Sequence, residues 1–261
     1  MIHVPRKRFG QHFLKDKNVI ERMIAVLNPK PEEHLIEIGP GQGALTIPVL
    51  NKTHQLEVIE FDRDLVVALQ QYNKKFRNLL VHSADVLHFD FAAIKHDERL
   101  LRIFGNLPYN ISTPLIFHLL NAASIIADML LMVQKEVAER LAAKVNTKQY
   151  GRLSVMVQYH CDVELLFDVA ADAFYPAPQV CSSVIRLLPH RDDRYLVKDY
   201  SFFKALVQAA FGQRRKTLRN SLKHLIDDES WMRIQLSSDV RPENLTVKDF
   251  IELCHRLLDK K

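Results

Sequence analysis

Short apolar runs alternate with segments of helical periodicity between residues 34 and 133, and this alternation constrains the fold more than any other feature. Each run predicts a buried strand, because its apolar residues are nearly continuous and are bounded by turn formers. Since parallel neighbours are joined by helices, the pattern predicts a parallel sheet covered on both faces, an α/β fold. The predicted strands are His34–Ile38, Gln55–Glu60, Leu79–His82, Leu100–Gly105 and Ile125–Val133.

The last hundred residues follow a different pattern. Val163–Ala170 and Ser183–Leu188 are predicted to form an antiparallel pair that closes the sheet, and the polar segment His190–Arg194 marks a boundary. The sequence thus predicts an α/β domain over residues 1–190, with a basic arm at 1–18, and a small all-helical domain over residues 191–261. The helical stripes beyond the boundary are Phe203, Leu206, Val207 and Ala210; Leu218, Leu222 and Leu225; and Val247, Phe250, Ile251, Cys254, Leu257 and Leu258.

Composition excludes several classes of protein. No apolar run approaches the roughly 18 uncharged residues of a membrane span, because Asp128 interrupts the longest candidate, Ala122–Val133. The N-terminus is basic without an apolar run behind it, so no secretory signal is predicted. The three cysteines are far apart and form no CxxC pair, which favours a reduced, cytoplasmic protein without disulfides or a zinc site.

Positive charge is concentrated at the two ends of the chain. Residues 1–18 carry five Lys or Arg and one acid, and residues 191–261 carry fifteen and eleven, whereas residues 19–190 carry sixteen and nineteen. Two basic ends flanking an acidic domain would suit a polyanion such as RNA. A scattered, solvated surface is an equally good interpretation of the counts alone.

A glycine-rich loop follows the first predicted strand. Gly39, Gly41 and Gly43 lie between that strand and a predicted helix, where the absence of Cβ atoms lets the backbone approach a ligand closely. Glu60 ends the second strand, 21 residues after Gly39, where its carboxylate can accept hydrogen bonds from ribose hydroxyls. This pair also fits a dinucleotide-dependent enzyme.

Two further features favour S-adenosylmethionine (SAM) over a dinucleotide. The loop has GxGxG spacing and follows Glu37. The run Ser83-Ala84-Asp85 closes the third strand, where Asp85 could accept from an adenine amine or merely cap a turn. Glu60, Asp85 and Asn106 end three successive strands. They would line the carboxyl edge of the sheet, where open α/β folds bind ligands.

The tetrapeptide Asn106-Leu107-Pro108-Tyr109 follows the fourth predicted strand. The asparagine amide can both donate and accept hydrogen bonds, and the proline fixes the backbone so that nearby carbonyls can face a ligand. The tyrosine offers a flat face for a nucleobase. Together they would suit the exocyclic amine of a base, although the same residues form ordinary turns.

Basic residues cluster in the predicted helical domain and in the arm. Arg215, Arg219 and Lys223 recur every fourth residue, beside a stripe of leucines on the same predicted helix. A solvated helix face is the usual meaning of such spacing, but five basic residues without an acid favour phosphate binding. The candidate RNA-binding residues are Arg6, Lys7, Arg8, Arg214, Arg215, Lys216, Arg219 and Lys223.

Together these motifs, with Gly10–Leu14 and the run Phe174-x-Pro176-x-Pro178-x-Val180-x-Ser182, resemble the rRNA adenine N6-dimethyltransferases over almost the full length. The glycine loop is generic, whereas the Asn106–Tyr109 and Phe174–Ser182 pair is specific. The resemblance implies a Rossmann-like class I SAM-dependent methyltransferase sheet. It is nearest the bacterial small-subunit type, which dimethylates two adjacent adenosines near the 3′ end of small-subunit rRNA during subunit biogenesis.

The resemblance also implies roles for individual residues. His12 and Leu14 would fold over the cofactor, Gly39 and Gly41 would lie along it, Glu60 would hold the ribose, and Asp85 the adenine amine. Asn106 would sit between the cofactor, which it also contacts, and the target. With Leu107 and Pro108 it would position the target amine, while Tyr109 and Phe174 would stack on the flipped base. The family most often has Asn where this chain has His12, so the resemblance implies a backbone contact at this position and leaves a side-chain contact open.

Several alternatives remain. A large-subunit rRNA adenine methyltransferase of the antibiotic-resistance type shares these motifs, whereas DNA adenine methyltransferases usually carry Pro in place of Leu107. A nicotinamide oxidoreductase leaves Asn106–Tyr109 unused, and a non-catalytic ribosome-assembly factor is compatible with the motifs. We expect a monomer that acts on small-subunit rRNA or the immature 30S subunit, with SAM and without a metal.

Overall fold

The computed structural model describes residues 5–6, 10–191, 196–213, 216–227, 229, 231, 234, 236–237 and 239–258, without the side chains of 73–76. By its internal contacts the chain divides into two compact units. The first comprises Met1–Ala138 and Glu164–Pro189, and the second comprises Glu139–Val163 and His190–Lys261. Glu139–Val163 thus belongs to the same compact unit as the C-terminal helices. The division into a catalytic domain and an RNA-binding domain at residue 190 stays a prediction.

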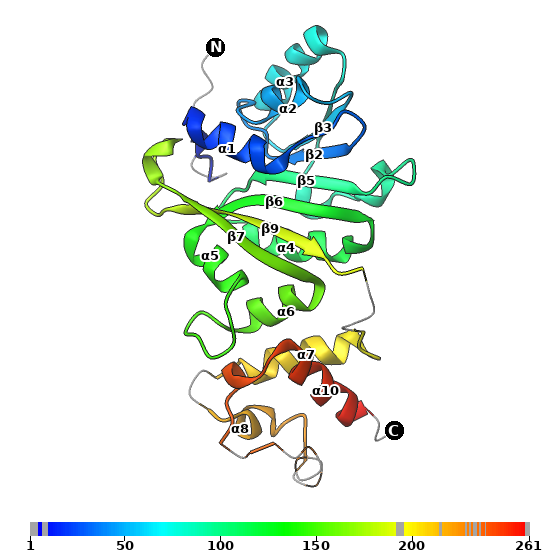
Figure 1. Cartoon of the computed structure of the whole chain (residues 1–261), viewed down its shortest axis with the longest axis vertical. Coiled ribbons are helices and arrows are strands. Elements are labelled where there is room, and N and C mark those ends of the chain that lie inside the picture. The colour runs from blue at the N-terminus through cyan, green and yellow to red at the C-terminus, as the bar shows by residue number, and fades with distance from the viewer. Residues whose placement is uncertain are drawn as a thin grey trace. The chain divides into compact units, whose positions relative to one another are not determined.

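The central sheet confirms the predicted α/β fold (Figure 1). Within the described residues it has seven strands in the order β4-β3-β2-β5-β6-β9-β7. The five strands from β4 to β6 pair in parallel, and β9 pairs antiparallel with β6. The order reverses between β2 and β5, and open sheets bind ligands at that point. The strands are β2 (His34–Ile38), β3 (Leu56–Glu60), β4 (Leu79–Ser83), β5 (Leu101–Asn106), β6 (Ile126–Gln134), β7 (Cys161–Val169) and β9 (Ser182–Pro189).

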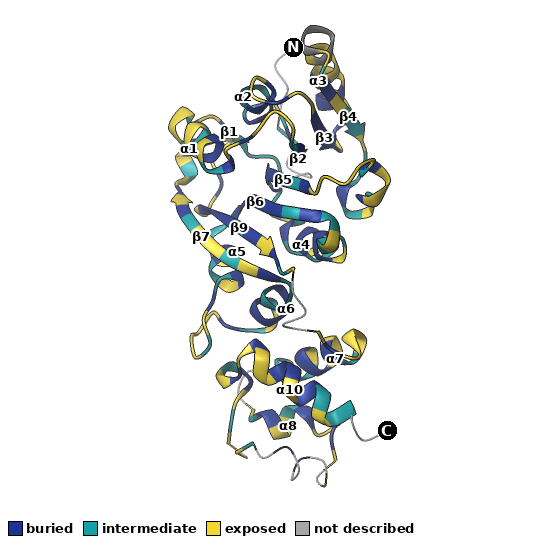
Figure 2. Ribbon diagram, turned by 45° about the vertical axis from the view of Figure 1, so that its right-hand side comes forward, coloured by how far each residue is buried: buried dark blue, intermediate teal, exposed yellow. Residues whose placement is uncertain are grey.

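Helices cover both faces of the sheet. All five residues of β2 and all five of β3 are buried, which requires packing on each side because side chains alternate between faces (Figure 2). Asp16 begins the first helix by accepting from the amides of Asn18 and Val19, and Asn28 ends it in the left-handed conformation. The helices of this part are α1 (Lys17–Leu27), α2 (Thr46–Leu50), α3 (Arg63–Phe76), α4 (Ser112–Asn121) and α5 (Lys135–Leu141), with short 3₁₀ turns η2 (Val86–His88), η3 (Ala92–Ile94), η4 (Ala123–Ile125) and η5 (Ala171–Ala173).

A two-stranded ribbon fastens the N-terminal arm to the first unit, and nothing in the sequence pattern predicted it. β1 (Phe13–Leu14) pairs antiparallel with β8 (Phe174–Tyr175), so that Leu14 lies opposite Phe174. Both of these side chains are buried in the core, at 7% and 1% exposure. The arm is therefore held by apolar packing as well as by backbone hydrogen bonds.

The described residues of the second unit form helices and turns, apart from Cys161–Val163 at the start of β7. The predicted stripe of α7, Phe203, Leu206, Val207 and Ala210, is buried, which confirms that pattern. In the next stripe Leu218 and Leu222 are buried, but Leu225 is 43% exposed, so that part of the prediction is wrong. No described helix is long and apolar enough to cross a membrane. The helices are α6 (Arg152–His160), α7 (Tyr200–Ala210), α8 (Leu218–Leu222) and α10 (Val247–Leu258), with the 3₁₀ turn η6 (Pro242–Asn244).

Candidate active site

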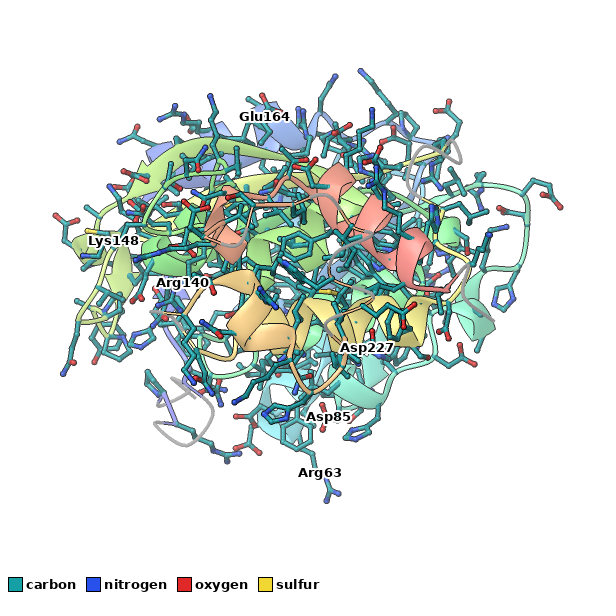
Figure 3. The ribbon with its side chains drawn as sticks, turned by 90° about the horizontal axis from the view of Figure 1, so that it is seen from below. Arg63, Asp85, Arg140, Lys148, Glu164 and Asp227 are labelled. Atoms are coloured by element: carbon teal, nitrogen blue, oxygen red, sulfur yellow. The ribbon has the colours of Figure 1, made fainter. Side chains whose placement is uncertain are left out.

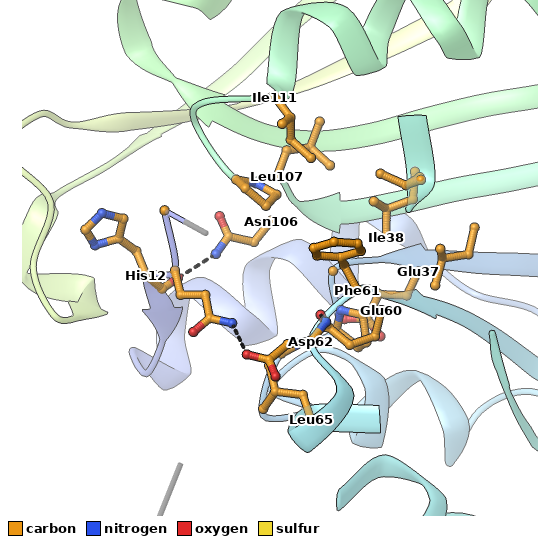
Figure 4. A pocket seen from close by; sticks show the side chains of 18 of the residues that line it. His12, Glu37, Ile38, Glu60, Phe61, Asp62, Leu65, Asn106, Leu107 and Ile111 are labelled. Atoms are coloured by element: carbon orange, nitrogen blue, oxygen red, sulfur yellow. Dashed lines mark hydrogen bonds between the residues drawn. The ribbon is translucent and has the colours of Figure 1, made fainter. Parts of the chain in front are cut away.

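A cavity of about 220 Å³ lies at the carboxyl ends of β2, β3, β4 and β5, with the N-terminal arm as one wall (Figure 4). The chain crosses from strand to helix at each of these ends, so the polar residues that follow the strands converge there. The predicted cofactor and substrate residues that line the cavity are His12, Leu14, Gly39, Gly41, Glu60, Asp85, Asn106, Leu107, Pro108 and Tyr109.

Glu60 presents a carboxylate that the backbone holds in place. Its two oxygens accept hydrogen bonds from the amide of Gly41 at 3.2 Å and from the amide of Asp62 at 2.8 Å. The side chain is 7% exposed, and burial raises its pKa above the ordinary value. A carboxylate has about four acceptor positions. The backbone of Phe61 is a third donor, and the carboxylate still has acceptor capacity toward a ligand.

The glycines of the loop serve the arm as well as a ligand. Gly39 and Gly41 have φ of 66° and 56°, a conformation that side chains rarely adopt. A Cβ at Gly41 would lie 3.0 Å from the ring of Phe13, so the arm packs directly on this part of the loop. Gly41 therefore has a second role, which is to admit the arm's aromatic ring.

Glu37 is a second buried acid beside the cavity. The hydroxyl of Thr46 donates to its carboxyl group at 2.6 Å. Burial raises the pKa of Glu37 to about 8 despite the opposing effect of this hydrogen bond, and the nearby Glu60 raises it further. Glu37 is consequently mostly protonated at neutral pH.

Asp85 both caps a turn and reaches the cavity. Its carboxylate accepts from the amide of Leu87 at 3.0 Å, and its other oxygen lies 3.2 Å from Nδ1 of His88. The side chain is 42% exposed and reaches the surface of the first unit (Figure 3). The capping role considered from the sequence is therefore present, and it leaves the residue accessible to a ligand.

Asn106 is oriented by the arm. Its amide nitrogen donates to the backbone carbonyl of His12 at 2.9 Å (Figure 4). The Leu107 amide donates to the carbonyl of Met132 at 3.0 Å, and Pro108 has no N–H to donate. The Asn106 carbonyl oxygen is therefore the part of the amide that remains to accept a hydrogen bond from a ligand.

The side chain of His12 contacts protein groups at the edge of the cavity. Its ring stacks on Tyr109 with centroids 5.4 Å apart, and Nδ1 lies 2.7 Å from the carbonyl of Pro176. The Tyr109 hydroxyl lies 2.6 Å from Oγ of Ser182, and burial raises the pKa of Tyr109. The backbone carbonyl of His12 also orients the Asn106 side chain, independently of any contact between His12 and a cofactor.

Phe174 does not line the cavity in this structure. The ring is 1% exposed and belongs to the core that holds Leu14. Stacking of Phe174 on a base would require the ring to leave this core, so that role stays a prediction. The next residue, Tyr175, is 62% exposed.

Arg6, whose role in RNA binding stays a prediction, is engaged with acids at the start of α3. Its guanidinium lies 2.9 Å from Asp62 and 2.5 Å from Asp64, and its backbone amide donates to Gln11 at 2.8 Å. Gln11 in turn donates to Asp62 at 3.0 Å (Figure 4). These contacts tie the arm to the cavity's rim. Lys7 and Arg8 lie outside the described residues.

Replacing Arg6 by Ala should therefore weaken SAM binding by roughly three- to tenfold, because its ion pairs with Asp62 and Asp64 help to order the arm. Calorimetric titration with SAM would measure the change. Arg63→Ala is the matched control, since Arg63 is the first residue of α3 but its side chain points outward (Figure 3). Unchanged SAM affinity together with a flatter salt dependence of RNA binding would instead make Arg6 an RNA contact.

The basic residues of the second unit are only partly described. Lys216, Arg219 and Lys223 are exposed, whereas Arg214 and Arg215 lie outside the described residues. Helix α8 covers only Leu218–Leu222, and Thr217 caps its start. Contrary to the sequence prediction, basic residues four positions apart over residues 215–223 therefore do not all lie on this one helix. The same unit also exposes Lys144, Lys148 and Arg152, which sequence reasoning overlooked (Lys148 in Figure 3).

Known proteins resemble this chain in sequence and in fold. A family model, ribosomal RNA adenine dimethylase, matches residues 2–259. Ribosomal RNA small subunit methyltransferase A of Chromohalobacter salexigens is 49% identical, covering 98% of this chain and 93% of that protein. A dimethyladenosine transferase structure from Plasmodium falciparum has a TM-score of 0.80 at 25% identity, covering 95% and 98% of the two chains. The 23S rRNA methyltransferase ErmE shares the fold, with a TM-score of 0.70 at 22% identity, covering 94% and 99%.

Proposed function

The chain belongs to the ribosomal RNA adenine dimethylase family, and we propose that it methylates the N6 amines of two adjacent adenosines near the 3′ end of small-subunit rRNA. It is an rRNA adenine dimethyltransferase with a class I methyltransferase fold. The observation that carries the proposal is the cavity, where Asn106 and two acids, Glu60 and Asp85, meet at the ends of neighbouring strands.

The cavity fits SAM as the methyl donor. Glu60 has acceptor capacity for the ribose hydroxyls, and exposed Asp85 can accept from the adenine amine. Gly39 lets the methionine portion of SAM approach the backbone closely. Glu37, whose pKa is raised by burial, adds little negative charge beside the glycine loop at neutral pH. Bound SAM supplies an electrophilic methyl group on its sulfonium.

The protein's part in the reaction is to position a weak nucleophile. The lone pair of an adenine amine is delocalised into the ring, so the nitrogen must become pyramidal to attack. The Asn106 oxygen and the Leu107 or Pro108 carbonyl would accept the two amine hydrogens and direct the lone pair at the methyl group. Alignment of this kind supplies a large share of the rate enhancement in group transfer.

The base itself needs an aromatic contact. Tyr109 offers a ring fixed by its hydrogen bond to Ser182, and His12 covers one face of that ring. An adenine would stack on the other face or displace the imidazole. The second methylation reuses this site after one amine hydrogen has been replaced, so the cavity must also accept a monomethylated amine.

The RNA partner is proposed to be the immature 30S subunit, bound by a monomer in the cytoplasm, where ribosomal subunits assemble. Lys216, Arg219 and Lys223 are the described cations proposed to contact phosphates. The large-subunit alternative has less support, because the relative with that activity is 22% identical. A small-subunit relative, in contrast, is 49% identical.

Replacing Lys216, Arg219 and Lys223 together by Gln should weaken RNA binding at low salt. The slope of log affinity against log salt should flatten by about 0.7 to 0.9 for each phosphate that the variant no longer neutralises. Filter binding across a salt series measures both effects. A triple variant of Lys30, Lys52 and Arg63, which are exposed in the first unit, is the charge-matched control. An equal slope for both variants would count against the assignment.

Labelled methyl transfer from SAM to undermethylated small and large subunits, in parallel, tests the substrate class. We expect label on the small subunit alone. Label on the large subunit alone would favour the resistance-type activity. Absence of transfer to either subunit, with SAM bound, would favour a binding role in subunit assembly.

A further inference from the structure

Tyr175 is a large aromatic side chain that the protein leaves in solvent beside the cavity. It is 62% exposed, whereas the preceding residue, Phe174, is 1% exposed. The difference follows from the strand β8, in which successive side chains point to opposite faces. Phe174 fills the core, and Tyr175 therefore faces away from it.

The ribbon places Tyr175 next to a residue that lines the cavity. Tyr175 lies directly opposite Phe13 in the antiparallel register of β1 and β8. Side chains of directly opposed residues share a face, with Cβ atoms roughly 5 Å apart. Phe13 lines the cavity and packs against Gly41, so the Tyr175 side chain begins at the cavity's border.

The residue after Tyr175 is tied to the proposed base-binding ring. The Pro176 carbonyl lies 2.7 Å from Nδ1 of His12, whose ring stacks on Tyr109. The backbone of Tyr175 is thus fixed on one side by strand pairing and on the other by His12. Little further ordering of this backbone is therefore needed when a ligand binds.

The chemistry around Tyr175 favours a nucleobase as the occupant. Val180 is 46% exposed and Cys181 is also exposed in the same loop, so the loop offers apolar area without charge. Stacking on an aromatic face is the interaction that single-stranded RNA uses where its bases are not paired. A base that is flipped into a pocket leaves its neighbour without one stacking partner.

We propose that Tyr175 is the stacking platform for the nucleotide adjacent to the target adenosine. The inference rests on the proposed function, since it needs an RNA strand that enters the cavity. For two adjacent target adenosines, one would occupy the cavity while the other stacks on Tyr175. Tyr175 is in this account a positioning residue for RNA and does not touch the reacting atoms.

Replacing Tyr175 by Ala should raise KM for undermethylated small subunits about tenfold, as expected for the removal of one base stack, and leave kcat within about twofold. Tyr175→Phe should stay within about twofold of the unaltered enzyme in both constants, because the ring face remains. Tyr175→Leu should resemble Ala, since it keeps apolar area without a flat face. Tyr72→Ala is the control, because Tyr72 is also exposed, at 38%, but does not line the cavity.

Each outcome decides the inference. A rise in KM for Ala and Leu but not for Phe or the control supports it, with unchanged SAM affinity in all four variants. Full activity of the Ala variant overturns it, as does full activity of the Leu variant, which would indicate an apolar protein contact. If the unaltered enzyme labels the small subunit, these results bear on Tyr175 alone. Failure of the unaltered enzyme to label it would overturn the proposed function and the inference together.

Discussion

Replacing Asn106 by Ala is expected to lower the rate of methyl transfer by roughly 10²- to 10³-fold or more, with SAM affinity retained within about tenfold. The loss follows because a preorganised polar group that acts in the transition state is worth several kcal/mol. The Asn106 nitrogen is already bound to the His12 carbonyl, so the variant removes the one amide oxygen available to the target amine. Single-turnover transfer to undermethylated small subunits measures the rate.

The same substitution also removes a hydrogen bond to the arm, and a second variant separates the two effects. Asn106→Asp keeps an oxygen acceptor but loses the N–H that donates to His12. If the acceptor matters most, Asp should retain more activity than Ala while binding SAM less tightly than the unaltered protein. Unchanged turnover in the Ala variant would contradict the proposed role of Asn106.

Replacing Gly105 by Ala is expected to destabilise the first unit by about 3 kcal/mol or more, because overpacking against backbone forces strands to shift. A Cβ at Gly105 would lie 2.3 Å from the carbonyl oxygen of Ile38 on the neighbouring strand. Gly39 follows Ile38 and Asn106 follows Gly105, and both line the cavity, so SAM binding should fall as well. Chemical denaturation with and without SAM measures both effects.

Gly151→Ala is the matched control for this prediction. A Cβ at Gly151 would meet nothing within 4 Å, and its extended backbone is open to any residue. The control should change the free energy of unfolding by less than about 1 kcal/mol. Equal stability of the two variants would contradict the close approach of β2 and β5.

The predicted strands agree with the structure to within one or two residues at their ends, and β2 and β3, which are buried on both faces, are apolar runs in the sequence. β2 matches its prediction at both ends, and Glu60, Asp85 and Asn106 meet at one cavity as expected. The shared carboxyl edge follows from the alternation of strand and helix, whereas the order of the strands is known only from the structure. The strands and their shared edge depend on short stretches of sequence, so the sequence alone was sufficient to predict them.

The features that the sequence did not reveal depend on contacts between distant segments. The β1–β8 ribbon joins residues some 160 positions apart through two-residue strands, which have no periodicity to detect. The arm's Arg6 was assigned to RNA by its charge, and only the fold brings it to Asp62. Helix α6 was also missed, although Val155 and Met156 are buried at helical positions.

The most direct test of the central claim is nucleoside and fragment analysis of small-subunit rRNA after reaction with SAM. We predict N6,N6-dimethyladenosine at two adjacent positions near the 3′ end, and its absence when the Asn106→Ala variant replaces the unaltered enzyme. Dimethyladenosine elsewhere in the RNA, methylation at an atom other than N6, or an equal yield from the variant would contradict the claim.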